Sequence, residues 1–178
     1  MADTKISALT AAGSFLLADI LPVDEAGTTK GATGTQIQTA LRGNAPQFQQ
    51  PANPTGRTGA PVMMGLGGVC VYTPKFTRVG VMFSGTASNA TLLDGITIQG
   101  YWGTGTAPVN AAAVTGSTFS AVKTVTSATA NARIGWALQS VIVSLTPSTA
   151  YWFDCAVGNV TGGVASIFDV DFSVFEIT

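Results

Sequence analysis

The residues whose spacing comes nearest to a known chemical motif form the glycine-rich stretch GTTKGATGTQIQTAL, residues 27–41. A Walker A phosphate loop requires G-x-x-x-x-G-K-[ST], with the lysine directly after the last glycine so that its ammonium reaches the phosphates. Here Lys30 precedes Gly31 and Gly34, and the residue five positions after Gly27 is alanine. The dinucleotide pattern G-x-G-x-x-G does not occur in this stretch either. We therefore expect no phosphate binding here.

Carboxylates supply a second candidate chemistry. Asp169 and Asp171 alternate along a predicted strand, and such a pair could share a Ca²⁺ ion, which takes six to eight oxygen ligands. Asp94 and Asp154 could join them in space. We favour a solvated sheet face, or one facing a polar subunit, because strands alternate for structural reasons alone. The opposite face is predicted to carry Phe168, Val170 and Phe172.

Nucleophilic catalysis and zinc binding have little to build on, because the chain contains no histidine. A glycosidase needs only two acids, but the acids here are scattered. Cys70 and Cys155 lie far apart and lack the C-x-x-C spacing of zinc sites. We expect them to be small buried hydrophobic residues, with a disulfide as the alternative. We predict no enzyme activity, no cofactor and no metal site.

Adjacent aromatic residues offer a possible ligand platform. Tyr101 and Trp102, and also Tyr151 and Trp152, could stack against sugar rings if they were exposed. In strands, neighbouring aromatic residues more often alternate between the core and a subunit interface, which is the interpretation we favour. If the protein binds a ligand, Tyr101 and Trp102 are the residues expected to face it.

The composition restricts the class of protein. Charged residues make up 10% of the 178 residues, against about 25% in ordinary soluble domains, so we expect other subunits to cover part of the surface. The net charge is -1 and the eight Lys and Arg residues are scattered, which argues against nucleic-acid binding. Polar residues interrupt every apolar run, so we expect no membrane span.

The chain divides into three predicted parts. Residues 1–43 carry an extended segment at 16–23, a DEAG turn, a return strand and a short helix capped by Thr35. This unit is too small to fold alone and must dock on something. Residues 44–61 hold four prolines, which predicts an extended, semi-rigid linker.

Residues 62–178 alternate like a β protein throughout. About seven or eight predicted strands, with no helix between them, indicate a mainly β fold: an antiparallel β-sandwich, either a jelly roll or another Greek-key arrangement. Leu145, Pro147 and Tyr151 have the spacing of a tyrosine corner, in which the phenol bonds back to the backbone across a strand connection.

The N-terminal part resembles the first segment of tailed-bacteriophage virion proteins, notably head fibres, decoration proteins and tail fibres. The resemblance covers about the first quarter of the chain. The matching residues are Lys5-Ile6-Ser7-x-Leu9, Asp19-Ile20-Leu21-Pro22-Val23, Gly27-Thr28-Thr29-Lys30 and the short helix that ends at Leu41. The β domain more loosely resembles small sandwich domains of phage proteins.

The resemblance implies a non-enzymatic virion protein at the particle surface, typically a homotrimer, that decorates the capsid or forms a head fibre and docks through its N-terminal segment. Its partners would be sister subunits and the major capsid protein or another virion protein. The alternative is a tail-fibre or receptor-binding tip that recognises a host surface glycan. The residues predicted to bury against the particle or sister subunits are Ile6, Leu9, Leu16, Leu17, Ile20, Leu21, Ile37 and Leu41.

Overall fold

The structure of the chain is a computed structural model, which describes residues 20–25, 28–33 and 42–177. The chain forms two compact units, Met1–Arg42 and Gly43–Thr178.

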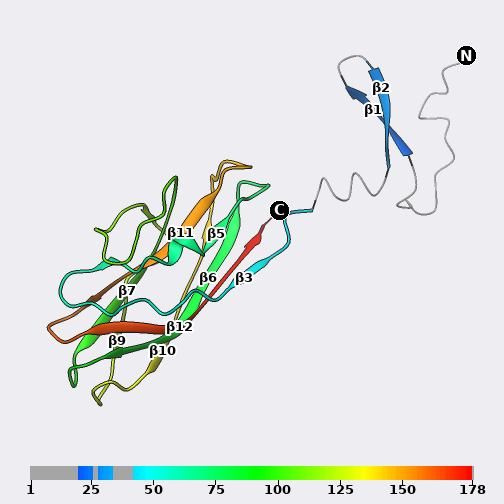
Figure 1. The fold of residues 1–178 in the computed structure, drawn as a ribbon. Coiled ribbons are helices and arrows are strands. Elements are labelled where there is room, and N and C mark those ends of the chain that lie inside the picture. Colours follow the sequence, from blue (N-terminus) through cyan, green and yellow to red (C-terminus); the bar gives the residue numbers. More distant parts are fainter. Residues whose placement is uncertain (1–19, 26–27, 34–41, 178) are drawn as a thin grey trace, which may run out of the picture. The chain divides into compact units, whose positions relative to one another are not determined.

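A β-hairpin is the described part of the first unit. Strand β1 (Ile20–Glu25) pairs antiparallel with β2 (Thr28–Thr33), so that Ile20 lies opposite Thr33 and Glu25 opposite Thr28 (Figure 1). The return strand is present as β2, and residues 20–23 of the predicted extended segment lie in β1, which continues through Asp24 and Glu25 of the predicted turn. The predicted helix after Thr35 lies outside the described residues.

The second unit contains two antiparallel sheets. The first has the order β10 (Ile134–Ile142), β6 (Val79–Asn89), β12 (Ala165–Glu176) and β3 (Gln47–Gln49). In the second, β11 (Tyr151–Asn159) pairs with β7 (Gly95–Thr104). The short strands β4 (Val62–Met63) and β5 (Val71–Tyr72) extend β11, and β8 (Ser117–Thr118) and β9 (Lys123–Thr126) extend β7. A 3-10 turn, η2 (Leu66–Gly68), lies between β4 and β5.

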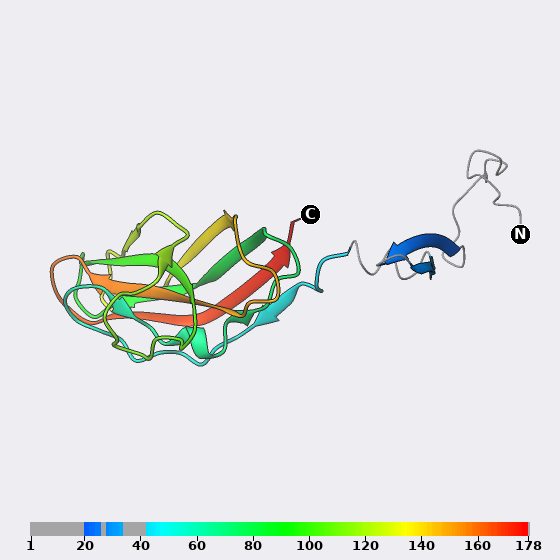
Figure 2. The same ribbon diagram turned by 90° about the horizontal axis from the view of Figure 1, so that it is seen from above.

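The strand order is that of a jelly roll. Because β4 and β5 share one place beside β11, and β8 and β9 share one place beside β7, the unit has eight strand positions. Numbered along the chain, these positions run 6-3-8-1 in one sheet and 2-7-4-5 in the other. Figure 2 shows the long strands β11 (orange) and β12 (red) running lengthwise through the unit. The predicted sandwich is confirmed, and its topology is the two-Greek-key jelly roll.

The core lies between the two sheets. Strand β6 directs Val79, Val81 and Phe83 inward, as its alternating sequence predicts, and all three side chains are buried. The rings of Phe83 and Phe153 lie 4.8 Å and 5.3 Å from the ring of Phe172, measured between centroids. These rings join the facing strands of the two sheets into one apolar cluster.

Part of the predicted linker belongs to the sandwich. Residues 47–49 form β3, which pairs with β12, and the backbone of Arg57 exchanges two hydrogen bonds with Ala165. The prolines did not prevent this pairing, because Pro46 and Pro51 flank β3 and the strand lies at a sheet edge, where a proline costs no ladder hydrogen bond.

Candidate interaction surface

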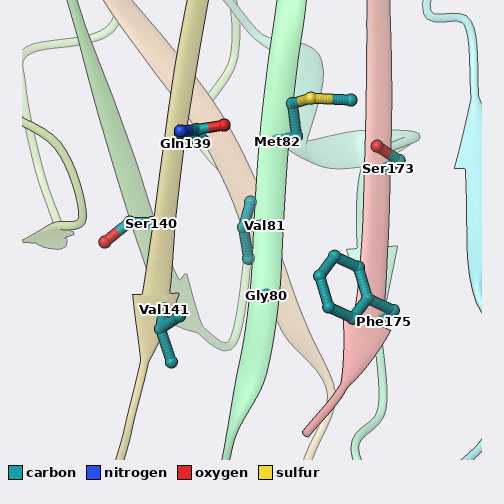
Figure 3. Close-up of a pocket in the computed structure, with 8 residues that line it drawn as sticks. All are labelled: Gly80, Val81, Met82, Gln139, Ser140, Val141, Ser173 and Phe175. Carbon is teal, nitrogen blue, oxygen red and sulfur yellow. The ribbon is translucent and has the colours of Figure 1, made fainter.

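The outer face of the four-stranded sheet holds a groove with a volume of about 350 Å³. Three apolar side chains project there, Met82, Val141 and Phe175, with 41, 55 and 47% of their surface exposed. Figure 3 shows them on β6, β10 and β12. The other residues that line the groove are Gly80, Val81, Gln139, Ser140 and Ser173.

The register of the strands aligns these residues in two rows. Val141, Gly80 and Phe175 lie side by side across β10, β6 and β12. The next row contains Gln139, Met82, Ser173 and Phe48. The Phe175 ring lies over Gly80, where a Cβ atom would overlap it. The glycine therefore lets the ring lie against the backbone, and it forms the floor of the groove.

The residues that line the groove include no ionisable side chain. Toward the start of β12, the nearest charged side chains are Asp171 and Asp169, and both already have partners within the chain. Asp171 Oδ1 accepts a hydrogen bond from Gln50 Nε2 at 2.7 Å, and Asp169 forms an ion pair of the same length with Arg133. The groove itself therefore offers apolar surface and neutral hydrogen-bonding groups, and charged side chains lie only beyond its lining.

The predicted acidic pair on β12 is not a shared site. A β-bulge between Phe168 and Asp171 shifts the register, and Asp169 adopts a left-handed φ of 51°. Asp169 turns to Arg133 and Thr86, whereas Asp171 turns to Gln50. Among the residues that the structure describes, no three His, Cys, Asp or Glu side chains are grouped as metal ligands.

The prediction that Phe168 shares the buried face with Val170 and Phe172 was wrong. The bulge inserts an extra residue, so the inward position before it is taken by Ile167. Phe168 is half-buried, and the guanidinium of Arg133 lies 4.1 Å from its ring centroid.

Asp94 is buried in a loop cluster, apart from the acids of β12. Its carboxylate accepts hydrogen bonds from Gly95 N, Thr161 N, Thr161 Oγ1 and Gly162 N. Burial raises the pKa of Asp94, but the hydrogen bonds from Thr161, Gly162 and Gly95 together outweigh it and hold the pKa below its ordinary value. The carboxylate ties the β11–β12 turn to the start of β7, which is a structural task.

Asp154 is fully buried beneath the turn η2. Gly65 N donates to it at 3.0 Å and Cys155 N at 2.7 Å. Burial raises the pKa of Asp154 to about 6, against the lowering effect of hydrogen bonds from the backbone of Cys155 and of residues 65–67. The carboxylate holds the turn against the outer side of β11.

Both cysteines are free and buried, which confirms the expectation for Cys70 and Cys155. Burial raises the pKa of the Cys70 thiol to about 12, with a further contribution from Asp154. The thiols behave as core side chains.

Tyr101 and Trp102 do not form a common platform, because consecutive residues of β7 point to opposite faces. Tyr101 is largely buried, its hydroxyl donates to Gln99 Oε1 at 2.8 Å, and it lines a groove of about 190 Å³ on the outer side. Trp102 packs toward the core, with its ring 5.4 Å from the ring of Tyr151.

The predicted docking residues of the first unit cannot be evaluated from their surroundings. Ile20 and Leu21 lie in β1. The others, Ile6, Leu9, Leu16, Leu17, Ile37 and Leu41, lie outside the described residues. They remain predictions.

The outer face of the four-stranded sheet was missed at the sequence level. Its signal was the uninterrupted apolar run Val81, Met82, Phe83, repeated as Val174 and Phe175, where strict alternation would place a polar residue outside. Such runs indicate strands with apolar side chains on both faces.

Comparisons with known proteins add a distant structural likeness. No family model matches the sequence, and no similar sequence was found among curated proteins. Among solved structures, the chain is similar to a chain in the "Structure of infectious bursal disease virus Gx strain", with a TM-score of 0.42 and 10% identity. The alignment covers 88% of this chain and 38% of the other. A likeness of this degree carries no argument about function. Within the described part of the chain, no helix is long and apolar enough to cross a membrane.

Proposed function

We propose that this chain is a non-enzymatic structural protein of a virus particle, an oligomeric capsid decoration or head-fibre protein of a tailed phage, and typically a homotrimer. The observation that carries the proposal is the apolar groove on the outer face of the four-stranded sheet, whose lining residues include no ionisable side chain. The resemblance of residues 1–41 to phage attachment segments supports the choice of particle.

The apolar face is suited to protein contact. The exposed side chains of Phe48, Met82, Val141 and Phe175 lie in adjacent rows of one sheet. Apolar surface gathered in this way marks interaction sites more often than isolated apolar residues do. With only 10% charged residues in the chain, few charges are available to keep such a surface free in solution.

The connection to the first unit is anchored in the sandwich. The carboxylate of Glu176, at the end of β12, accepts hydrogen bonds from the backbone N–H groups of Asn44, Lys75 and Phe76. The chain therefore enters the second unit at a fixed point of the sheet. In the proposed role, residues 1–43 bind the particle, and the hydrogen bonds to Glu176 connect this segment firmly to the jelly roll.

A particle-binding experiment tests the proposal. The full chain is mixed with purified particles that lack it, and bound protein is measured after sedimentation and located on the head or tail by antibody labelling. Full-length protein should bind to heads, whereas deletion of residues 1–43 should abolish binding. A full-length variant, Leu16→Asp with Leu17→Asp, provides a second arm that does not depend on truncation. Undiminished binding by both changed proteins would overturn the assignment.

A glycan-binding tip is the alternative, and its specific support is the groove beside Tyr101 and Gln99. Glycan-array binding by the full chain that is lost in a folded Gln99→Ala variant would favour it. Labelling of tails rather than heads in the particle experiment would point the same way.

A further inference from the structure

Strand β10 is the longest edge strand among the described sheets. It lies at the end of the four-stranded sheet and pairs with β6 alone, over Ile134–Ile142. Its sequence, IGWALQSVI, contains no charged residue and no proline. In the part of the chain that the structure describes, no other backbone group is hydrogen-bonded to this strand.

The other described edges are protected in ways that β10 is not. Strand β3 has three residues between two prolines. Strands β4, β5 and β8 have two residues each, and β9 has four and begins with Lys123. Natural proteins shorten or charge their edges, or place proline there, to stop chains from adding strand to strand. An edge of nine residues without such protection is suited to pairing.

No described strand pairs with the free side of β10. Its outward residues Gly135, Ala137, Gln139 and Val141 are exposed. Ser140 points to the inner side of the sheet, as the core residue Leu138 does. Unlike Leu138, it is only half-buried. Every second N–H and C=O of an edge strand points away from its one neighbour, so a row of donors and acceptors faces outward.

We propose that β10 pairs antiparallel with β10 of a second copy of this chain. A row of unpaired backbone groups is best satisfied by another strand. In a two-fold contact the strand meets itself, so any charge on it would face a like charge. The absence of charge on β10 removes that obstacle, which favours a second copy over a charged partner.

The register follows from using the whole strand. A two-fold axis through Leu138 places Ile134 opposite Ile142 of the second copy, and Ala137 opposite Gln139. The four-stranded sheets of two copies then become one continuous sheet, whose outer side carries two adjacent apolar faces. This inference rests on the proposed structural role. Because a three-fold trimer contains no two-fold axis, the contact would join copies from two different trimers rather than neighbours within one.

Sedimentation of the full chain tests the contact. The variant Ala137→Lys with Gln139→Lys changes two exposed outward residues and places lysines of one copy opposite lysines of the other. We expect at least a tenfold weaker association than in the wild type. The control, Leu92→Lys with Val109→Lys, adds the same two charges at exposed loop residues outside the apolar face and outside β10, and it should associate like the wild type. Undiminished association of the edge variant, or an equal loss of association in the control, would overturn the edge proposal.

Cross-linking locates the contact directly. A Gln139→Cys variant should form covalent dimers with a short bismaleimide, because its thiol would lie near the two-fold axis, whereas both native thiols are buried. Val122→Cys is the control, since Val122 is also exposed, at 53%, but lies outside β10. Equal cross-linking of both variants, or of neither, would overturn the proposal. If particle binding survives in the lysine variant while cross-linking fails, the edge contact falls and the proposed function stands.

Discussion

At two buried carboxylates, the effects of burial and of hydrogen bonding on the pKa are balanced in opposite ways. Around Asp94, hydrogen bonds outweigh burial and the pKa is lowered. Around Asp154, burial outweighs the hydrogen bonds and the pKa is raised to about 6. Both residues hold loops in place, yet they affect stability in different pH ranges.

The raised pKa of Asp154 predicts a specific loss of stability. Because the folded protein holds this proton more tightly than the unfolded chain, the contribution is complete below about pH 4 and is lost as the pH rises to about 6. Each pH unit in that range corresponds to about 1.4 kcal/mol, so the loss amounts to about 3 kcal/mol. Urea unfolding of the wild type and Asp154→Asn at pH 4, 5, 6 and 7 measures it. The amide cannot titrate, so an equal decline in the variant would contradict the explanation.

The predicted tyrosine corner is present, and it makes a second test possible. The hydroxyl oxygen of Tyr151 accepts a hydrogen bond from Thr146 N at 2.8 Å. Tyr151→Phe leaves that N–H without its partner and should lower the free energy of unfolding by about 1 kcal/mol or more. The matched control is Tyr72→Phe, whose hydroxyl reaches Asn44 O at 3.4 Å and should cost less. Chemical denaturation of both variants gives the comparison, and equal losses would show that the corner has no special role.

Among the elements, strands that obey simple alternation could be predicted, and those that depend on tertiary pairing could not. The inward set of β6 follows from period two. The bulge at Asp169 does not, because the inserted residue is recognisable only from its register against β6. Strand β3 was missed because three residues between prolines acquire strand geometry only through β12. The edge position of β10 depends on strand order, which no local pattern contains.

The turn between β11 and β12 depends on one glycine in particular. Gly163 has a φ of 76°, and a Cβ atom there would overlap Asn89 Oδ1. Gly163→Ala should therefore lower the free energy of unfolding by about 2 kcal/mol. The adjacent Gly162→Ala is the control, because its Cβ atom would meet only Asp94 Oδ2 at 3.5 Å, and it should change stability by less than about 1 kcal/mol. Thermal and urea unfolding of the two variants measures the difference between their free energies of unfolding. Equal free energies would show that the turn can adopt another conformation at no cost.

For the whole molecule, the low charge content and the sheet architecture have the same consequence. Only 10% of the residues are charged, so few charged side chains are available to surround the apolar face. Strand β10 contains no charged residue that would protect its edge from pairing. An exposed apolar face and an unpaired strand edge both favour association. In the proposed assembly the apolar side chains would leave water, and the backbone groups of the edge would gain hydrogen-bond partners. Under the proposed structural role, both surfaces would be covered in the assembled particle.

Assembly through β10 predicts that thermal stability depends on protein concentration. A partner that binds only the folded chain raises the unfolding temperature as concentration rises above the dissociation constant, because association removes folded monomer from the unfolding equilibrium. Over a hundredfold range of concentration, the apparent Tm of the full chain should rise by several degrees, since a stabilisation of about 2.7 kcal/mol accompanies a hundredfold excess over Kd. The variant Ala137→Lys with Gln139→Lys should lose most of this dependence and keep the Tm of the dilute wild type, whereas Leu92→Lys with Val109→Lys should retain it. A Tm of the wild type that is constant across the range would mean that copies do not stabilise one another in solution.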